Sequence, residues 1–595
     1  MSYVAPLKDM LFVMNELAGL SAISALPGYE DATPETVEAV LEENARFCSE
    51  VLAPLNFTGD RQPSTWHDGR VTTSKGFKEA FTAFASAGWQ GLQHPAEFGG
   101  QALPKLVATP CIEMLNAANL SFALCPLLTD GAIEALITAG TDAQKEIHLA
   151  NLISGKWTGT MNLTEPQAGS DLAMVRTRAV PQGDGSYKLF GTKIFITYGE
   201  HDMAENIIHM VLARTPDAPP GVKGISLFIV PKFLISADGT LGARNDVHCV
   251  SIEHKLGIKA SPTAVLQFGD HGGAIGTLVG EENRGLEYMF IMMNAARFGV
   301  GMQGVGLAEC AYQKAVQYAK DRVQSRDLAG SAGPVAIIHQ PDVRRMLMSI
   351  KSLNEAARAL VLWTALKADV AHRSDDEKAR QAADDHMGLL TPVLKGVLTD
   401  NGLSNSVMAQ QIFGGHGYIA EHGMEQFVRD ARITMIYEGA NGIQALDLVG
   451  RKLGRDGGRA ITAFFGEVSA FVKEHAADEA MKPYVAPLGE ALATLQQATM
   501  WFMQNAMKKP DNAGAGSTDY MHLFGLVAMA YMWAQMAKAA QDKLKAGANG
   551  SEERMKAKLV TGRFFMERML PESATHLKRI QTGADTMMAL PAEAF

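Results

Sequence analysis

The segment MNLTEPQAGSD, residues 161–171, lies where the pattern of this 595-residue chain changes from helical to β-rich. Upstream, residues 35–155 carry apolar side chains at mostly helical spacing, with turn clusters such as PAEFGG (95–100) between them. Downstream, short apolar runs separated by Gly, Pro and Asp predict strands, among them KLFGTKIFIT (188–197) and GISLFIVP (224–231). The sequence therefore predicts a compact β-domain over residues 156–282, inserted between helical parts.

Long helical patterns resume after the β-rich region and continue over residues 283–453, until GRDGGR (454–459) supplies a clear linker. Residues 460–595 are again helical in pattern, and residues 1–34 form an N-terminal extension. A chain of this length exceeds what one core supports and is typical of roughly three to five domains. We expect a mostly α protein with one inserted β-domain and a C-terminal helical extension.

Charge argues against a polyanionic partner. The net charge of −10 is spread along the chain without long blocks, which disfavours nucleic acid as a ligand. In residues 461–595 the acidic and basic side chains number 14 each, so that region presents no basic face. Small-molecule chemistry is the better expectation.

The five cysteines are scattered and include no CxxC pair, which suits a reducing cytoplasm and excludes a metal site built from cysteine. We expect no metal. Lys8, Asp9 and Glu16 interrupt the apolar core that a signal peptide needs, so no export signal is predicted and the expected location is cytoplasmic. The most membrane-like stretch, Leu523–Ala537, is shorter than the ~20 residues that span a bilayer. It is predicted to be a buried helix, without stable membrane insertion, and peripheral membrane contact stays open.

One carboxylate stands out in RITMIYEGANGIQ (432–444), where Glu438 lies between an apolar stretch and a run of small residues. An apolar wall raises the pKa of a carboxylate, and such groups cluster at functional sites. The alternative is a Glu at a helix start, stabilised by exposed amides.

Arg297 is the single charge in YMFIMMNAARFGVGMQGVGLA (288–308), and a buried guanidinium needs a partner. Glu438 is one candidate, and a carboxylate elsewhere in the helical core is the other. The same run contains GVGMQG (299–304), which matches a dinucleotide fingerprint but follows a helical pattern instead of a strand. Close helix packing through small residues is the preferred interpretation.

Two loops have compositions that suit ligand binding. MNLTEPQAGSD could offer hydroxyls and backbone amides to an anion or a flavin edge, although an ordinary turn accounts for it equally well. In QIFGGHGY (411–418), adjacent glycines let the backbone approach a ligand closely, and the alternative is a tight turn between helices.

Five motifs in order resemble the acyl-CoA dehydrogenase family over roughly residues 40–455. They are GWQGLQHPAEFGG (88–100), GTMNLTEPQAGSD (159–171), HKLGIKASPT (254–263), QIFGGHGY and MIYEGANGIQ (435–444). The N- and C-terminal segments look like the long bacterial branch of that family, which includes 3-methylmercaptopropionyl-CoA dehydrogenases.

The resemblance implies a helical N-domain, a middle β-barrel-like domain and a helical C-domain, with FAD at their junction and partly at a subunit interface. Glu438 falls on the family's catalytic base, which removes the α-proton of an acyl-CoA thioester while the β-hydride leaves for flavin N5. The product is the trans-2-enoyl-CoA, and electrons pass to an electron-transfer flavoprotein. A homodimer is implied as well.

The resemblance also assigns contacts. For substrate it implies Ser170, Asn294, Arg297 and Gly439. Asn294 stands where many members carry Asp, and Ala440 and Gly442 replace polar side chains near the adenosine phosphate. Phe195 replaces a more usual Trp beside the flavin. The residues implied for FAD are Thr164, Ser170, Phe195, Thr197, Arg322, Gln340, Gln411, Gly414, Gly415 and Asn441.

Other readings of the sequence remain. An acyl-CoA oxidase differs only in whether oxygen reaches the reduced flavin, and the family's alkylation-response relatives bind DNA through a basic C-terminal face. A structural or regulatory flavoprotein is a third alternative, which the retention of Glu438 disfavours. The acyl chain stays open between 3-methylmercaptopropionyl and ordinary fatty acyl groups.

Overall fold

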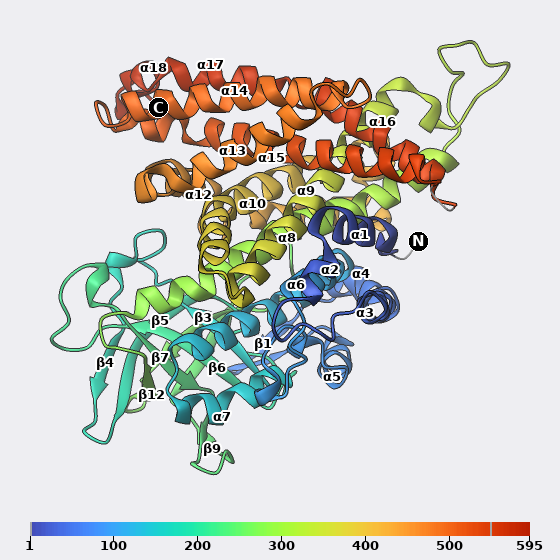
Figure 1. The fold of residues 1–595 in the computed structure, drawn as a ribbon. Helices are drawn as coiled ribbons and strands as arrows, with labels where there is room; N and C mark the ends of the chain where they lie inside the picture. Colours follow the sequence, from blue (N-terminus) through green and yellow to red (C-terminus); the bar gives the residue numbers. More distant parts are fainter. Residues whose placement is uncertain (1–2, 548–549) are drawn as a thin grey trace.

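The computed structural model describes residues 3–547 and 550–595. Figure 1 shows the β-strands gathered at one end of the molecule and the helices of residues 460–595 at the opposite end, with long helices between them. The expected fold class, helical N- and C-domains around a middle β-domain with a C-terminal helical extension, is confirmed.

The N-terminal part is helical apart from a small hairpin that the sequence did not predict, β1 and β2. The 35-residue helix α6 bends at Asn119, whose backbone leaves helical geometry (φ −161°, ψ 92°). The Asn119 side-chain oxygen accepts from the Phe122 N–H and so caps the second half of the helix. The elements are α1 (Leu7–Val13), α2 (Leu20–Ser24), α3 (Pro34–Phe47), α4 (Ala53–Arg61), β1 (Thr65–His67), β2 (Arg70–Thr72), α5 (Phe77–Ser86), α6 (Lys105–Ala139) and α7 (Asp142–Ile153).

The middle domain is an antiparallel path of strands with one parallel pair, in the order β10-β11-β5-β12-β7-β6-β3, and β4 also pairs with β5. The long strand β5 pairs with β11 through its second half and with β4 and β12 through its first half, so it joins two parts of the sheet. The strands are β3 (Trp157–Asn162), β4 (Arg178–Pro181), β5 (Ser186–Thr197), β6 (Asn206–Ala213), β7 (Ser226–Pro231), β8 (Phe233–Ile235), β9 (Leu241–Arg244), β10 (Val247–Ile252), β11 (Thr263–Phe268) and β12 (Ala274–Val279).

The central helices pack closely through glycines. A Cβ on Gly402 would lie 2.5 Å from the Gly304 Cα, so the GVGMQG segment serves helix packing, as its helical setting predicted. The helices are α8 (Gly285–Asp321), α9 (Pro341–Arg373), α10 (Glu377–Ile412), α11 (Met424–Thr434) and α12 (Asn441–Asp447).

The C-terminal helices cover the central layer, and α15 is buried over most of its length. Leu523–Ala537 lies within α15, so its prediction as a buried helix is confirmed. By length and composition, the one described helix that could cross a membrane is α6 instead, and 78% of its most apolar window is buried inside the protein. The helices are α13 (Arg459–His475), α14 (Lys482–Asn505), α15 (Asp511–Lys545), α16 (Glu552–Arg568), α17 (Glu572–Thr582) and α18 (Asp585–Ala589).

Candidate active site

Glu438 lies in the short loop between α11 and α12, in a strained backbone conformation. Its φ is +57°, a region that costs a non-glycine residue of order 1–3 kcal/mol and that is often found at functional sites. Gly439 follows with φ +84°, and a Cβ there would lie 2.6 Å from the Gln444 side-chain nitrogen. The Asn441 N–H donates to the Met435 carbonyl over 3.0 Å and closes the loop. The small residue after Glu438 is therefore required by the turn itself.

The Glu438 carboxyl is partly buried, and burial raises its pKa. The positive charges of Arg297 and Lys395 oppose that effect without cancelling it. This direction agrees with the effect expected of an apolar wall. Within residues 3–547 and 550–595, no cation lies within ion-pair distance of the carboxylate. The group is thus a base with a raised pKa and incomplete compensation.

Arg297 lies on α8 and reaches the loop through its backbone. Its Nε donates to the Glu438 carbonyl over 3.3 Å, so the predicted pairing with the Glu438 carboxylate is not a direct ion pair. Burial lowers the Arg297 pKa, while the charges of Asp447 and Glu438 raise it. Arg297 thus fixes the position of the loop backbone and places a positive charge near the Glu438 carboxylate.

Two further residues, Tyr437 and Lys395, support the loop, and the sequence analysis predicted neither role. The Tyr437 hydroxyl donates to the Gln303 side-chain oxygen. The fully buried Lys395 on α10 donates to the Asn441 side-chain oxygen over 2.8 Å. The sequence did carry a signal for Lys395, because it is an isolated charge inside an apolar helical segment, as Arg297 is in its own segment.

The Asn441 side chain, which was expected to contact FAD, is hydrogen-bonded within the protein. Its side-chain nitrogen donates within the protein to the Gly396 carbonyl, Thr399 Oγ1 and Asp400 Oδ1, at 3.0, 2.9 and 2.7 Å. With its oxygen taken by Lys395, this buried amide has no free N–H for an adenosine. Asn441 therefore supports the loop, and its assignment to the cofactor stays a prediction.

A second loop is anchored by a buried ion pair. Lys193, on β5, donates to Glu165 Oε1 over 2.8 Å and to the Leu163 carbonyl over 2.9 Å. Burial alone would raise the Glu165 pKa, but the charge and hydrogen bonds of Lys193, with Thr177, lower it to about 2. The loop of residues 161–171 is thus fixed against β5.

This arrangement brings Thr164 to the strand that carries Phe195 and Thr197. The Ile194 N–H donates to the Thr164 carbonyl over 2.9 Å. Phe195 has φ +61° and is 59% exposed, which is unusual for an aromatic side chain in a strand. In the part of the chain that the structure describes, neither threonine hydroxyl has a hydrogen-bond partner. Free hydroxyls beside an uncovered aromatic face suit a planar ring with polar edges.

The other residues expected at FAD lie at the surface of the chain. Ser170 and Arg322 are exposed, and Gln340 donates its side-chain amide to the Arg326 carbonyl over 3.0 Å. The exposed residues Gln411, Gly414 and Gly415 occupy the end of α10 and the 3-10 turn that follows.

Two cavities are lined in part by residues of α6. The larger, of about 430 Å³, is lined by Asn294 and Arg297, and its wall carries both basic and acidic side chains: Lys105, Lys452, Arg455, Glu134, Asp369, Asp384 and Asp447. The smaller, of about 50 Å³, lies between the two halves of α6 and is lined mainly by apolar side chains.

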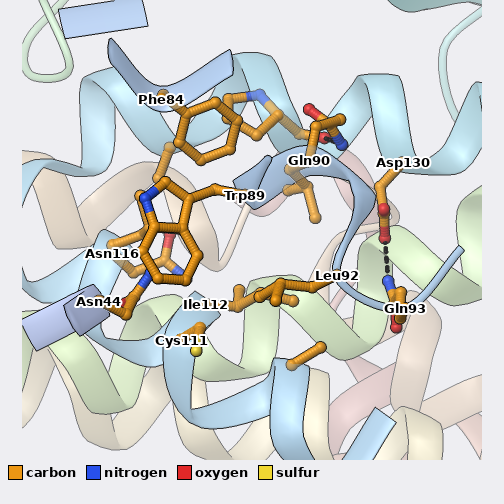
Figure 2. A pocket seen from close by; sticks show the side chains of 15 residues that line it. Asn44, Phe84, Trp89, Gln90, Leu92, Gln93, Cys111, Ile112, Asn116 and Asp130 are labelled. Carbon is orange, nitrogen blue, oxygen red and sulfur yellow. Dashed lines mark hydrogen bonds between the residues drawn. The ribbon is translucent and has the colours of Figure 1, made fainter. Parts of the chain in front are cut away.

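Figure 2 shows the smaller cavity, with Phe84 and Trp89 on one side and the hydrogen bond between Gln93 and Asp130 on the other. The Gln93 amide donates to Asp130 Oδ2 over 2.6 Å. Gln93 lines both cavities, so the two volumes share a wall.

Known proteins match this chain along its length. Residues 34–156, 160–271 and 283–453 match the N-terminal, middle and C-terminal domains of acyl-CoA dehydrogenases, and residues 464–591 match an acetyl-CoA dehydrogenase C-terminal-like domain. A 3-methylmercaptopropionyl-CoA dehydrogenase of Ruegeria pomeroyi is 47% identical over 99% of both chains. The chain belongs to the acyl-CoA dehydrogenase family.

Two more distant proteins are also similar to this chain. A broad-specificity linear acyl-CoA dehydrogenase of Mycobacterium tuberculosis is 35% identical over the whole of both chains. The structure of a Bacillus anthracis acyl-CoA dehydrogenase complexed with FAD is 22% identical, covers 94% of this chain and 90% of its own, and superposes with a TM-score of 0.75. At that identity the match shows a shared fold.

Acyl-CoA dehydrogenases are FAD-dependent oxidoreductases, and this chain has the groups to hold FAD. Thr164 and Thr197 would bind the edge of the isoalloxazine ring, and Phe195 would cover its face. The exposed aromatic and the two unpartnered hydroxyls are the observations that support this fit.

Proposed function

We propose that the enzyme dehydrogenates a short-chain acyl-CoA thioester at its α and β carbons, with Glu438 as the base. The observation that carries the proposal is the setting of Glu438, a carboxyl with a burial-raised pKa on a strained loop beside two cations. A base with a pKa closer to that of its substrate removes a carbon-bound proton more effectively.

The chain's own residues perform three tasks. Glu438 removes the α-proton, and the bound FAD supplies the acceptor for the β-hydride. The Glu438 backbone N–H has no partner among the described residues, so it is free to donate to the thioester oxygen as negative charge develops there. Arg297 and Gly439 keep this loop close to the substrate.

The two cavities support a division of the substrate. The larger cavity offers basic side chains to the phosphates of the CoA arm and contains Asn294 and Arg297. The smaller cavity offers an apolar volume of about 50 Å³, enough for only a few heavy atoms of an acyl tail. A 3-methylthiopropionyl group is short enough for it, and it is the substrate named for the Ruegeria pomeroyi relative. A long fatty acyl tail would need the cavity to open.

Apolar residues exposed at one region support a homodimer as the working form. Val323, Leu328, Tyr418 and Ile419 are between 47% and 85% exposed, and they flank the surface residues expected at FAD. A second copy would cover them and would supply Arg322 and the Gln411 loop to its neighbour's cofactor. We expect reoxidation by an electron-transfer flavoprotein in the cytoplasm, with acyl-CoA oxidase activity as the alternative.

The decisive experiment replaces the base. Glu438→Gln preserves side-chain shape and FAD binding, and flavin reduction by acyl-CoA in stopped flow should slow by at least ~100-fold. Reoxidation by an artificial acceptor should be unchanged. Reduction at the wild-type rate in a folded, FAD-loaded variant would overturn the assignment.

A screen of acyl-CoA thioesters tests the substrate. With an artificial acceptor, 3-methylthiopropionyl-CoA and butyryl-CoA should give a higher kcat/KM than palmitoyl-CoA, and oxygen alone should support little turnover. Preference for palmitoyl-CoA would contradict the role given to the small cavity. Light scattering of the FAD-loaded protein as a monomer would contradict the shared cofactor site.

A further inference from the structure

The C-terminal extension makes a close helix contact beneath the active-site loop. A Cβ on Gly396 of α10 would lie 2.3 Å from the Met521 sulfur of α15, and one on Gly525 would lie 2.8 Å from the Val397 side chain. The two helices therefore pack closely here, because the Met521 side chain lies over Gly396 and the Val397 side chain lies over Gly525. This part of α10 is flanked by Lys395 and Asp400, both of which contact Asn441.

A continuous series of hydrogen bonds runs from this contact to the loop. His522 Nε2 on α15 lies 2.8 Å from Asp400 Oδ2. The other Asp400 oxygen accepts from the Asn441 amide over 2.7 Å, and the Asn441 oxygen accepts from Lys395. Asn441 is the first residue of α12 and closes the Glu438 loop through its own N–H. The extension is thus linked to the Glu438 loop through three side chains, His522, Asp400 and Asn441, and Lys395 binds the last of them.

The His522 ring is itself held by the extension. It stacks on the His576 ring of α17 with centroids 5.9 Å apart and an interplanar angle of 15°. His576 Nδ1 lies 2.7 Å from Asp519 Oδ1. These contacts orient the His522 ring towards Asp400.

The charged groups around Glu438 come from two helices. Arg297 faces it from α8 and Lys395 from α10, and both favour its ionised form. The Lys395 pKa is lowered to about 8, mainly by burial and in part by the positive charge of Arg297. The negative charges of Glu438 and Asp400 act in the opposite direction. Arg297 in turn interacts with Asp447 and Arg451. Removing one of these charges changes the field at the base.

We propose that His522, Asp400, Asn441 and Lys395 form a positioning unit, through which the C-terminal extension holds Glu438 in its catalytic conformation. The proposal rests on Glu438 being the base. The C-terminal extension then helps to support the active site. Lys395 donates the hydrogen bond that holds Asn441 in place and puts a positive charge near the Glu438 carboxylate.

Two variants separate the two parts of this unit. His522→Ala removes the link at a partly exposed position, where folding should survive. Lys395→Gln keeps a hydrogen-bond donor for Asn441 and removes the charge. The matched control is Thr499→Val, which breaks the buried hydrogen bond between Thr499 and Tyr520 inside the extension without touching the unit. FAD content and melting temperature are measured for all three.

Flavin reduction by acyl-CoA is followed in stopped flow across pH. His522→Ala should slow the limiting rate by ~3-fold to ~100-fold, the range for displacing a reacting group from its productive geometry, with little change in substrate affinity. Lys395→Gln should shift the acidic limb of the profile upwards by ~1 unit or more, because an opposite charge no longer favours the ionised base. Thr499→Val should lower the melting temperature and leave the rate and the pH profile unchanged.

Three results would count against the proposal, and they are distinguishable. If Glu438→Gln reduces flavin normally, the base assignment fails and the positioning unit fails with it. If Glu438→Gln is inactive while His522→Ala and Lys395→Gln keep the wild-type rate and profile, the base stands and the positioning role is wrong. A slowed rate in all three variants, in proportion to lost stability, would show a merely structural role.

Discussion

Two groups of buried charges in the helical part of the molecule are neutralised to very different degrees. The first, the interdomain cluster, centres on Arg358 of α9, which donates to Glu113, Glu309 and Asp9 at 2.6 to 3.0 Å. The second consists of Glu438, Arg297 and Lys395, whose charges interact without a direct ion pair, and because it contains the proposed base it is named the catalytic cluster.

The interdomain cluster joins parts of the chain that are far apart. Its members come from α1, α6, α8 and α9, and Lys558 of α16 adds bonds to Asp9 and to Glu355. The charge of Glu113 and its neighbours keeps the Arg358 pKa well above its usual range against the effect of burial. Every charge there has a partner, as expected of groups buried for structure.

The catalytic cluster is left incomplete, and the incompleteness is what makes it useful. In a direct ion pair, the Glu438 carboxylate would have a lower pKa than in its present setting and would be a weaker base. In the catalytic cluster the cations contact the loop backbone and Asn441, and the carboxylate itself stays available. Comparing partner geometry separates the structural cluster from the reactive one, although both contain buried Arg, Lys and Glu.

The largest expected effect is on stability, in the interdomain cluster. Arg358→Met leaves Glu113 and Glu309 buried without a paired cation, while Asp9 keeps Lys558, and it should lower the free energy of unfolding by about 3–5 kcal/mol. Urea unfolding measures it. Arg345→Met on the same helix removes an exposed pair with Asp342 and should cost about 1 kcal/mol or less. Equal losses in the two variants would erase the distinction between buried and surface pairs.

An intermediate effect is expected in the pH dependence of the catalytic cluster. With Glu438 as the proposed base, its carboxylate must be ionised to react, and burial raises its pKa. Flavin reduction should therefore be lost as pH falls through a value above the ~4.3 of an ordinary Glu. Below that value the rate should drop about tenfold per pH unit, with binding retained. A limb at or below the ordinary Glu value would mean that the charges of Arg297 and Lys395 outweigh burial at Glu438.

Sequence patterns predicted the parts of this molecule that depend on local spacing. The β-domain followed from short apolar runs between turn residues, and Glu438 was singled out by its neighbours in one segment of thirteen residues. The buried helix at Leu523–Ala537 and the packing role of GVGMQG followed in the same way.

Long-range pairings were not predictable from those patterns. Arg358 and Glu113 are 245 positions apart, and Lys558 and Asp9 are 549 apart, so no local periodicity relates them. Lys395 was overlooked because its partner Asn441 lies 46 positions away. The β1–β2 hairpin has strands of only three residues, too short for an alternating pattern to be distinguished from a loop.

The smallest effect on stability is expected at Lys558, because each carboxylate that it binds in the interdomain cluster also has a second cation. Lys558→Met removes the bonds from α16 to Asp9 and Glu355, but Asp9 keeps Arg358 and Glu355 keeps Lys351. Neither carboxylate is left without a cation, so the free energy of unfolding should fall by about 1.5–3 kcal/mol, the worth of a hydrogen bond to a charged group. Urea unfolding of Lys558→Met, Asp9→Asn and the double variant completes a cycle, and the coupling between the two sites should be about 1 kcal/mol. A loss as large as that of Arg358→Met would show that Lys558 is the main counter-charge, and that the C-terminal extension, more than α9, neutralises the N-terminal helix.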